Sequence, residues 1–168
     1  AGQFSANGKD EAEFYLALNP GEPVKPLENI ASGGELSRIM LAIKTVLADA
    51  EDTPTLIFDE IDAGISGVTA AKVGEKLKLI GKSRQVICIT HLSQIAAVAD
   101  SHFLIEKSAE NESVKTRIRL LNEEDSVKEL ARILGGDKIT SSIMESAREM
   151  KEMAKSEISV SYTHLRAH

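Results

Sequence analysis

Two short apolar runs, separated by one helical pattern, constrain the fold of this chain most. The runs are 55–58 and 86–90, and they consist of apolar residues and threonine. The segment 68–80 between them carries apolar side chains at helical spacing: Ala70, Val73, Leu77 and Ile80. Runs of this kind are typical of strands buried on both faces of a parallel sheet, and parallel neighbours need a long crossover. The segment therefore predicts a βαβ unit.

Patterns on the C-terminal side extend this alternation. A short helix is expected near 93–99, followed by a strand at 102–106. Alternating apolar residues at 114–121 predict one more strand, paired with 102–106 as a hairpin. The βαβαβ order predicts an α/β fold with a mainly parallel sheet flanked by helices.

Two further helices are expected before the pattern ends. The first begins with a capping box at 126–129 and stops at the glycine pair 135–136. The second has an apolar stripe of Ile143, Ala147, Met150 and Ala154. Residues 1–156 are therefore expected to form one lobe, and 157–168 a tail that is disordered or non-native.

The N-terminal side predicts a strand at 13–18, a proline-rich loop at 19–26 and a helix that begins at Ser32. Ser32 and Glu35 form a capping box, in which each side chain can satisfy a free backbone N–H at the other residue. The stripe that this helix is expected to bury consists of Leu36, Ile39, Met40, Ile43, Val46 and Leu47.

Composition limits the classes of function. No apolar run approaches the roughly 20 residues that span a bilayer, and no signal-peptide pattern opens the chain, so we expect a cytoplasmic protein without a membrane partner. The single cysteine, Cys88, is expected to be a small core hydrophobe. The net charge of −6 gives no global reason to bind DNA. The basic stretch from Lys72 to Arg84 is interpreted as a solvated helix face, with a phosphate-backbone contact as the alternative.

Asp59 and Glu60 follow the first strand directly, and this position suggests nucleotide chemistry. Ligands meet an open α/β sheet at the carboxyl ends of its strands. There Asp59 can hold Mg²⁺, which prefers hard oxygen ligands, and Glu60 can orient or deprotonate the attacking water. The alternative is that both are surface acids at the start of a loop.

The run Ser32-Gly33-Gly34-Glu35 suggests an anion site at the start of a helix. Glycine in the first turn costs roughly 1 kcal/mol against alanine, and two in succession leave bare backbone N–H groups at the positive helix end. A capping box without a ligand is the alternative. His91 ends the second strand, where it could donate to a γ-phosphate or be a structural histidine.

Taken together, these motifs resemble the C-terminal lobe of an ABC-type ATPase head. More narrowly, they resemble the RecN family of bacterial DNA repair proteins, which are relatives of the SMC proteins. The resemblance covers roughly 11–153 and rests on four stretches: Ala31–Arg38 (ASGGELSR), Thr55–Asp62 (TLIFDEID), Gln85–Leu92 (QVICITHL) and Ala99–Phe103 (ADSHF).

The resemblance implies a role for each motif residue. It implies that Ser32 and Gly34, with Gly33 and Glu35 in the same signature motif, contact the γ-phosphate of ATP held by an opposing head. Asp59, in the Walker B motif, would position Mg²⁺, and Glu60 would activate water. Asp62 would belong to the D-loop across the dimer, and His91 would sense the γ-phosphate. DNA would be engaged by the full-length protein, which would associate with the nucleoid.

The chain lacks a usable phosphate-binding loop. The segment 2–10 is one residue too long and has no preceding strand, whereas 81–83 leads from a helix into a strand, the reverse of the required order. We therefore expect the fragment to be inactive without an N-terminal lobe that supplies this loop. Two rival interpretations are the nucleotide-binding domain of an ABC transporter and a non-catalytic binding module that retains the fold.

Overall fold

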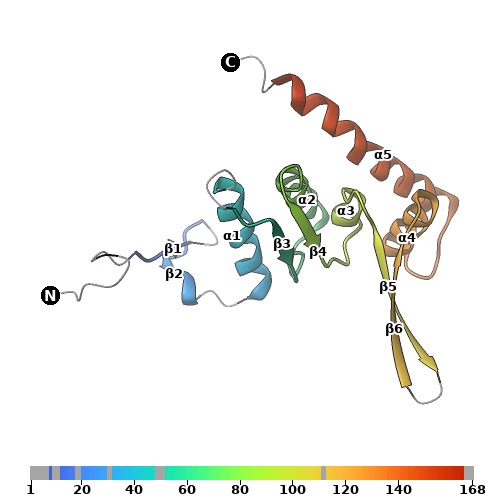
Figure 1. Cartoon of the computed structure of the whole chain (residues 1–168), viewed down its shortest axis with the longest axis horizontal. Helices are drawn as coiled ribbons and strands as arrows, with labels where there is room; N and C mark the ends of the chain where they lie inside the picture. Colours follow the sequence, from blue (N-terminus) through green and yellow to red (C-terminus); the bar gives the residue numbers. More distant parts are fainter. Residues whose placement is uncertain are drawn as a thin grey trace.

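The computed structural model describes residues 8, 12–17, 20–29, 32–47, 52–110 and 113–164. Its elements run in chain order from β1 to α5 (Figure 1). They are β1 (Tyr15–Leu16), β2 (Lys25–Pro26), the 3-10 turn η1 (Leu27–Asn29), α1 (Gly33–Val46), β3 (Thr55–Phe58), α2 (Gly67–Gly81), β4 (Gln85–Cys88), α3 (Ser93–Ala97), β5 (Phe103–Glu110), β6 (Ser113–Leu120), α4 (Glu123–Gly135) and α5 (Ser141–His164).

The predicted βαβ unit is present. β3 and β4 pair in parallel, from Thr55 opposite Gln85 to Phe58 opposite Cys88. α2 is their crossover, and its four predicted core residues are all buried. They pack with Leu56, Phe58 and Ile61 in the first of two hydrophobic clusters. The helical spacing in 68–80 therefore identified the packed face correctly.

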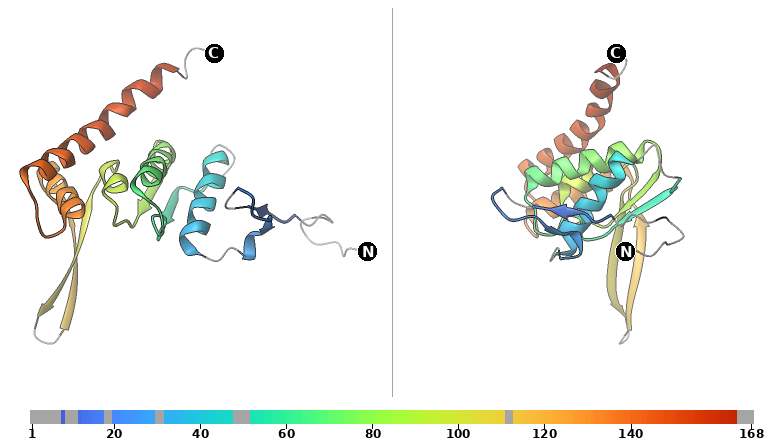
Figure 2. Two further views of the ribbon diagram at one scale, coloured as in Figure 1. Left: turned by 180° about the vertical axis from the view of Figure 1, so that it is seen from behind. Right: turned by 90° about the vertical axis from the view of Figure 1, so that its left-hand side faces the viewer.

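The expectation of a mainly parallel sheet is wrong for the described residues. These contain three two-stranded sheets, of which only β3–β4 is parallel. β5 does not join β4 but pairs antiparallel with β6, from Phe103 opposite Leu120. The resulting hairpin extends away from the helices in both views of Figure 2. The 102–106 strand thus satisfies its backbone groups within the hairpin instead of extending the parallel pair.

The strands β3 and β4 are covered on one face only. Leu56 and Phe58 point into the core, whereas Ile57 between them is 68% exposed and Ile87 on β4 is 44% exposed. The expectation that these strands are buried on both faces is therefore wrong for the described part of the chain. Ile57 and Ile87 are exposed because side chains alternate across a strand, so every second residue lies on the face that α2 does not cover.

The stripe predicted for α1 is also largely uncovered. α1 buries Gly34 and Leu41, whereas Leu36, Met40, Val46 and Leu47 are exposed. Its contact with the rest of the chain is with α2 and the turn after β3, on the side that carries Gly34. The expectation that this stripe is buried is therefore wrong for the described residues, because the apolar residue that α1 buries, Leu41, lies outside it.

The C-terminal helices form a second cluster with α3. Val127, Leu130 and Ala131 of α4 pack with Ala147 and Ala154 of α5. α4 begins one turn earlier than expected, because Asn122 caps it by accepting a hydrogen bond from the N–H of Asp125 at 2.8 Å. The predicted cap, Ser126, is buried inside the helix. The glycine pair ends α4 as expected, with Gly136 at φ +59°.

The two chain ends also differ from expectation. β2 falls within the segment predicted as a loop and pairs with β1, so 19–26 is not irregular throughout. Leu18 of the predicted first strand lies outside the described residues. α5 continues to His164, past residue 156, where the apolar pattern ends. The assignment of 157–168 as non-native stays a prediction. None of the helices described is both long and apolar enough to cross a bilayer.

Candidate active site

The carboxyl end of β3 leads into a turn that carries two exposed acids. Asp59 and Glu60 both reach solvent, and the N–H of Glu60 donates to Oδ1 of Asp59 at 2.9 Å. Glu60 has φ +57°, the left-handed region, which costs a residue other than glycine about 1–3 kcal/mol. The surrounding contacts hold this conformation, and it turns the Glu60 side chain toward the start of α1.

The first turn of α1 lies directly against this turn. A Cβ atom built on Gly33 would be 2.6 Å from Oε2 of Glu60. One built on Gly34 would be 2.9 Å from the carbonyl oxygens of both Glu60 and Ala63. Gly34 is therefore required for the close approach, whereas at Gly33 the built atom meets only the end of the Glu60 side chain. The contact joins the signature run to the Asp59-Glu60 pair within one chain.

Two side chains from the next turn of α1 hold this arrangement in place. The hydroxyl of Ser37 donates to the carbonyl of Asp59 at 3.0 Å. Nη1 of Arg38 donates to the carbonyls of Ile61 and Ala63 at 3.1 and 2.9 Å. No sequence pattern predicts a role for Ser37 or Arg38, because only their position one turn after the glycines distinguishes them. They fix the turn after β3 through its backbone.

Ser32 caps α1 as predicted. Its Oγ accepts a hydrogen bond from the N–H of Glu35 at 3.2 Å, and Glu35 is the acidic residue of the first turn. The first N–H groups of a helix have no partner within it, and they lie at the positive end of its dipole. The Ser32–Glu35 turn can thus present backbone donors to an anion beside Glu60.

Asp62 links the turn after β3 to the end of β4. It is only 3% exposed, and its Oδ2 lies 2.6 Å from Oγ1 of Thr90, 2.8 Å from the backbone N of His91 and 3.0 Å from Nδ1 of His91. Burial raises the pKa of the Asp62 carboxyl, but the hydrogen bonds from Thr90 and His91 and the charge of His91 outweigh it, so the net pKa is lowered. Asp62, for which a contact across a dimer was predicted, points into its own chain.

The predicted site residues therefore meet at one end of the β3–β4 pair. Ser32, Gly33, Gly34 and Glu35 start α1, Asp59, Glu60 and Asp62 follow β3, and His91 follows β4. Asp62 is buried, while the His91 side chain is 73% exposed. The individual roles of these residues stay predictions.

The exposed acids at the end of β3 can supply one magnesium ligand, but the described residues do not form a complete metal site. Among the described residues, no group of three or more histidine, cysteine or acidic side chains is placed to hold a metal ion. Mg²⁺ at nucleotide sites is usually bound by one or two carboxylates together with substrate phosphates. Asp59 fits that requirement, because its carboxylate is exposed at the strand end.

Cys88 lies close to these acids but is not a nucleophile. It is half-buried against the first hydrophobic cluster, as expected for a small core residue. Burial, followed by the negative charges of Asp62 and Asp59, raises the pKa of its thiol to about 12. The thiol therefore stays protonated near neutral pH.

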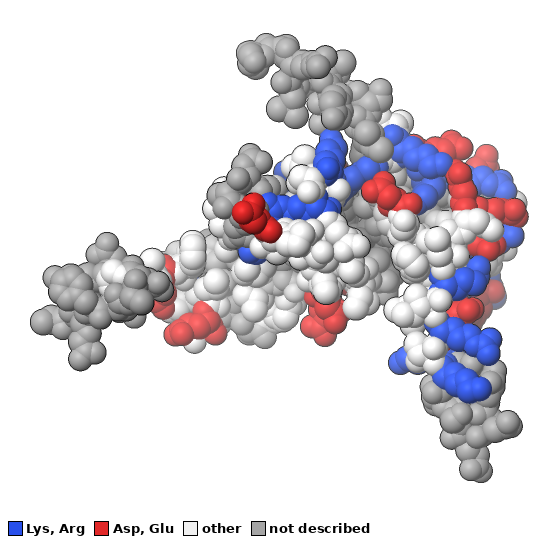
Figure 3. Space-filling view, in the orientation of Figure 1, with Lys and Arg blue, Asp and Glu red and all other residues white. Residues whose placement is uncertain are grey.

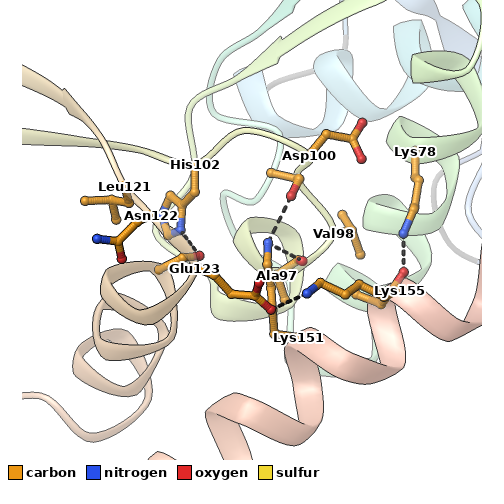
Figure 4. Close-up of a pocket in the computed structure, with 13 residues that line it drawn as sticks. Lys78, Ala97, Val98, Asp100, His102, Leu121, Asn122, Glu123, Lys151 and Lys155 are labelled. Atoms are coloured by element: carbon orange, nitrogen blue, oxygen red, sulfur yellow. Dashed lines mark hydrogen bonds and ion pairs between the residues drawn. The ribbon is translucent and has the colours of Figure 1, made fainter.

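A separate cavity of about 250 Å³ lies between α2, α3, α4 and α5 (Figure 4). Its lysines donate to groups of the protein itself. Nζ of Lys151 donates to the carbonyls of Ala97 and Ala99 at 3.1 and 2.9 Å, Lys78 donates to the Ala154 carbonyl, and Lys155 pairs with Glu123. These contacts hold α5 against α2 and α3, so the cavity has a structural explanation.

Charge is distributed unevenly over the surface. Lysine and arginine side chains lie along the described part of the β5–β6 hairpin (Figure 3). On β6, every second residue from 115 to 119 is basic, so Lys115, Arg117 and Arg119 share one face of the strand. Arg119 forms an ion pair with Asp125 at 3.0 Å. The exposed acids Asp59 and Glu60 lie on a different part of the fold, at the end of β3.

Comparison with known proteins identifies relatives for most of the chain. No family model matches. The DNA repair protein RecN of Halalkalibacterium halodurans is 47% identical over 153 residues, which are 91% of this chain and 27% of that protein. The chain is homologous to RecN. RecN of Treponema pallidum is 48% identical over 85% of this chain and 25% of its own length, and RecN of Bacillus subtilis is 40% identical over 90% and 26%.

The chain spans about a quarter of the length of these RecN relatives. Among solved structures, a chain from work on the ATP-driven dimerisation and DNA-stimulated activation of SMC ATPases aligns with 76% of this chain and 83% of its own length. It has 25% sequence identity and a TM-score of 0.49. This likeness is too low to carry an argument, and the relation to RecN rests on the sequence.

Proposed function

We propose that this chain is the C-terminal part of a RecN-like ATPase head. In this proposal it supplies the signature motif (Ser32–Glu35), the Walker B acids (Asp59 and Glu60) and His91 to a dimer of heads. ATP would be sandwiched between the two heads. Asp59 would hold Mg²⁺ with the phosphates of ATP, and Glu60 would activate the attacking water. Ser32, Gly33, Gly34 and Glu35 would face the γ-phosphate bound by the second head.

The contact between Gly33 and Glu60 carries this proposal. It puts backbone donors suited to an anion beside a carboxylate suited to a general base, both at the surface. The side chain of His91, which follows the neighbouring strand β4, also reaches solvent. A surface of this composition can contribute one half of a nucleotide site, whereas the grip on the α- and β-phosphates has to come from another polypeptide segment.

Exposed apolar faces support the proposal that a partner lobe packs against this chain. Ile57, Ile87 and Ile89 leave one face of the β3–β4 pair open, with exposures of 68%, 44% and 50%. The apolar residues on one face of the hairpin are also exposed: Phe103, Ile105, Ile118 and Leu120. Contiguous exposed apolar surface marks an interaction site. We propose that an N-terminal head lobe with a phosphate-binding loop covers it.

The names of the relatives suggest the process in which this ATPase acts. Since the RecN proteins are named for DNA repair, we propose that the full-length protein acts in double-strand break repair and recombination in the cytoplasm, on the nucleoid. The resemblance of the motifs at Ser32–Glu35, Asp59-Glu60 and His91 to those of ABC-type ATPase heads suggests that two identical heads dimerise around ATP. The identity to RecN favours this proposal over a transporter domain.

Reconstitution tests the proposal. The chain on its own should show no appreciable ATPase activity, because its sequence contains no usable phosphate-binding loop. Activity should return when the chain is mixed with the N-terminal lobe of the same protein. Turnover by the chain alone, with contaminating ATPases excluded, would refute the half-site. A mixture that binds neither ATP nor a second head would refute the proposed function as a whole.

A further inference from the structure

The contact between Asp62 and His91 has a consequence for the chemistry of the histidine. Oδ2 of Asp62 accepts hydrogen bonds from Oγ1 of Thr90 and from the backbone N–H of His91, and Nδ1 of His91 lies 3.0 Å from the same oxygen as an ion-pair contact. Oγ1 of Thr90 in turn accepts from the N–H of Leu92 at 3.1 Å, which directs its own proton to Asp62. Two hydrogen bonds thus fix Oδ2 of Asp62 independently of the imidazole ring.

The direction of the imidazole contact follows from the chemistry of the carboxylate. An ionised carboxylate has only lone pairs to offer, and at 3.0 Å it would repel a lone pair on Nδ1, so Nδ1 of His91 has to carry the proton. Hydrogen bonds to the charged form favour ionisation of Asp62, in agreement with its lowered pKa. A neutral imidazole carries one proton, so with Nδ1 protonated its Nε2 keeps a free lone pair.

We propose that Asp62 is a positioning residue, which fixes the tautomer and direction of the His91 ring so that this ring acts on the nucleotide site through Nε2 alone. The buried carboxylate orients the exposed imidazole, as the bond made by one ring nitrogen sets the state of the other. The action of the His91 ring on a nucleotide rests on the proposed function. It replaces the direct contact across the dimer that the resemblance implied for Asp62.

Nitrogen NMR of the chain tests the tautomer without ATP. Long-range ¹H–¹⁵N correlation spectra of the imidazole rings, with the His91 signals assigned by their loss in His91→Gln, should show neutral His91 protonated at Nδ1. Asp62→Ala should shift His91 to the Nε2-protonated tautomer that free imidazole side chains prefer. Thr90→Val, which removes one donor from Asp62 but leaves the His91 contact, should keep the wild-type tautomer. A wild-type spectrum with the proton on Nε2 would overturn the proposal, and this result needs no variant to fold.

Kinetics of the full-length protein test the positioning role. Asp62→Ala should lower kcat by about 10- to 100-fold, as for loss of a group that orients a functional histidine, while KM for ATP stays near its wild-type value. Asp62→Asn should recover part of kcat, because its carbonyl still accepts from Nδ1. Asp52→Asn, at an exposed acid before β3, is the matched control and should change neither constant. A raised KM with unchanged kcat would show that Asp62 binds nucleotide and would overturn the positioning role. Absence of ATPase activity in the wild-type protein would refute the proposed function and leave the NMR result standing.

Discussion

Gly34 lies against Ala63 so closely that a Cβ atom built on Gly34 would be 2.8 Å from the Cβ atom of Ala63. The same atom would be 2.9 Å from two backbone carbonyl oxygens, of Glu60 and Ala63. Backbone atoms in a turn fixed by Arg38 cannot move aside easily. The start of α1 and the turn after β3 therefore form one rigid unit.

Gly34→Ala should destabilise the chain, whereas Gly33→Ala should not. We expect Gly34→Ala to lower the free energy of unfolding by about 1–3 kcal/mol, the usual cost of overpacking. At Gly33 the added methyl would meet only the end of the flexible Glu60 side chain, so the cost is small and is offset by the better helix propensity of alanine. Urea unfolding of both variants measures the difference. Equal losses would contradict the close approach at Gly34.

Glu60→Gln should slow ATP hydrolysis in the reconstituted protein by roughly 10²-fold or more, because a general base is lost. The amide keeps the shape of the side chain, so ATP binding should stay near normal and ATP-bound dimers should accumulate. Single-turnover hydrolysis and size-exclusion chromatography with ATP measure both effects. Unchanged hydrolysis would make Glu60 a surface acid without a catalytic role.

Ser32→Ala separates a structural role from a functional one. As a helix cap, Ser32 contributes about 1 kcal/mol to stability, which the thermal midpoint reports. As a signature residue that reaches a second head, it should also be needed for ATP-dependent dimerisation, with ATP binding to one head unchanged. We expect both effects, measured by thermal melting and by light scattering with ATP on the same variant. A lower midpoint with normal dimerisation would leave Ser32 as a cap alone.

The stability of the chain should fall as the pH is lowered through the range in which free histidine takes up a proton, in part because of His102. Burial and the charge of Lys151 lower the pKa of His102 from its ordinary value of 6.5, against an opposing effect of Glu129. Its Nδ1 lies 2.9 Å from the hydroxyl of the buried Ser126. The unfolded chain therefore binds the proton at a higher pH than the folded chain, so stability is lost below about pH 6.5.

Urea unfolding at about pH 7.5 and pH 5.5, on either side of the ordinary histidine pKa, measures this loss. In His102→Gln the difference between the two free energies of unfolding should be smaller than in the wild type. An undiminished pH dependence in His102→Gln would assign the effect to other groups.

Local patterns in the sequence predicted most helices and strands and the motifs at their ends. The helical spacing of apolar residues identified the buried face of α2, and the short apolar runs identified β3 and β4. These features depend on neighbours within a turn or on one strand, so periodicity reports them directly. The same locality explains why the cap at Ser32 was predicted correctly.

Which neighbour each element packs against depends on contacts between segments that are distant in the sequence. Asn122 and Ser126 are both residue types that cap helices well, but only Asn122 caps α4. The hydroxyl of Ser126 instead contacts His102, which is distant in sequence. β5 pairs with β6 instead of extending the parallel pair. The inward direction of Asp62 depends on Thr90 and His91, which follow another strand. Such contacts join residues far apart in the chain, and their free energy is set by packing and hydrogen bonds that no local pattern records.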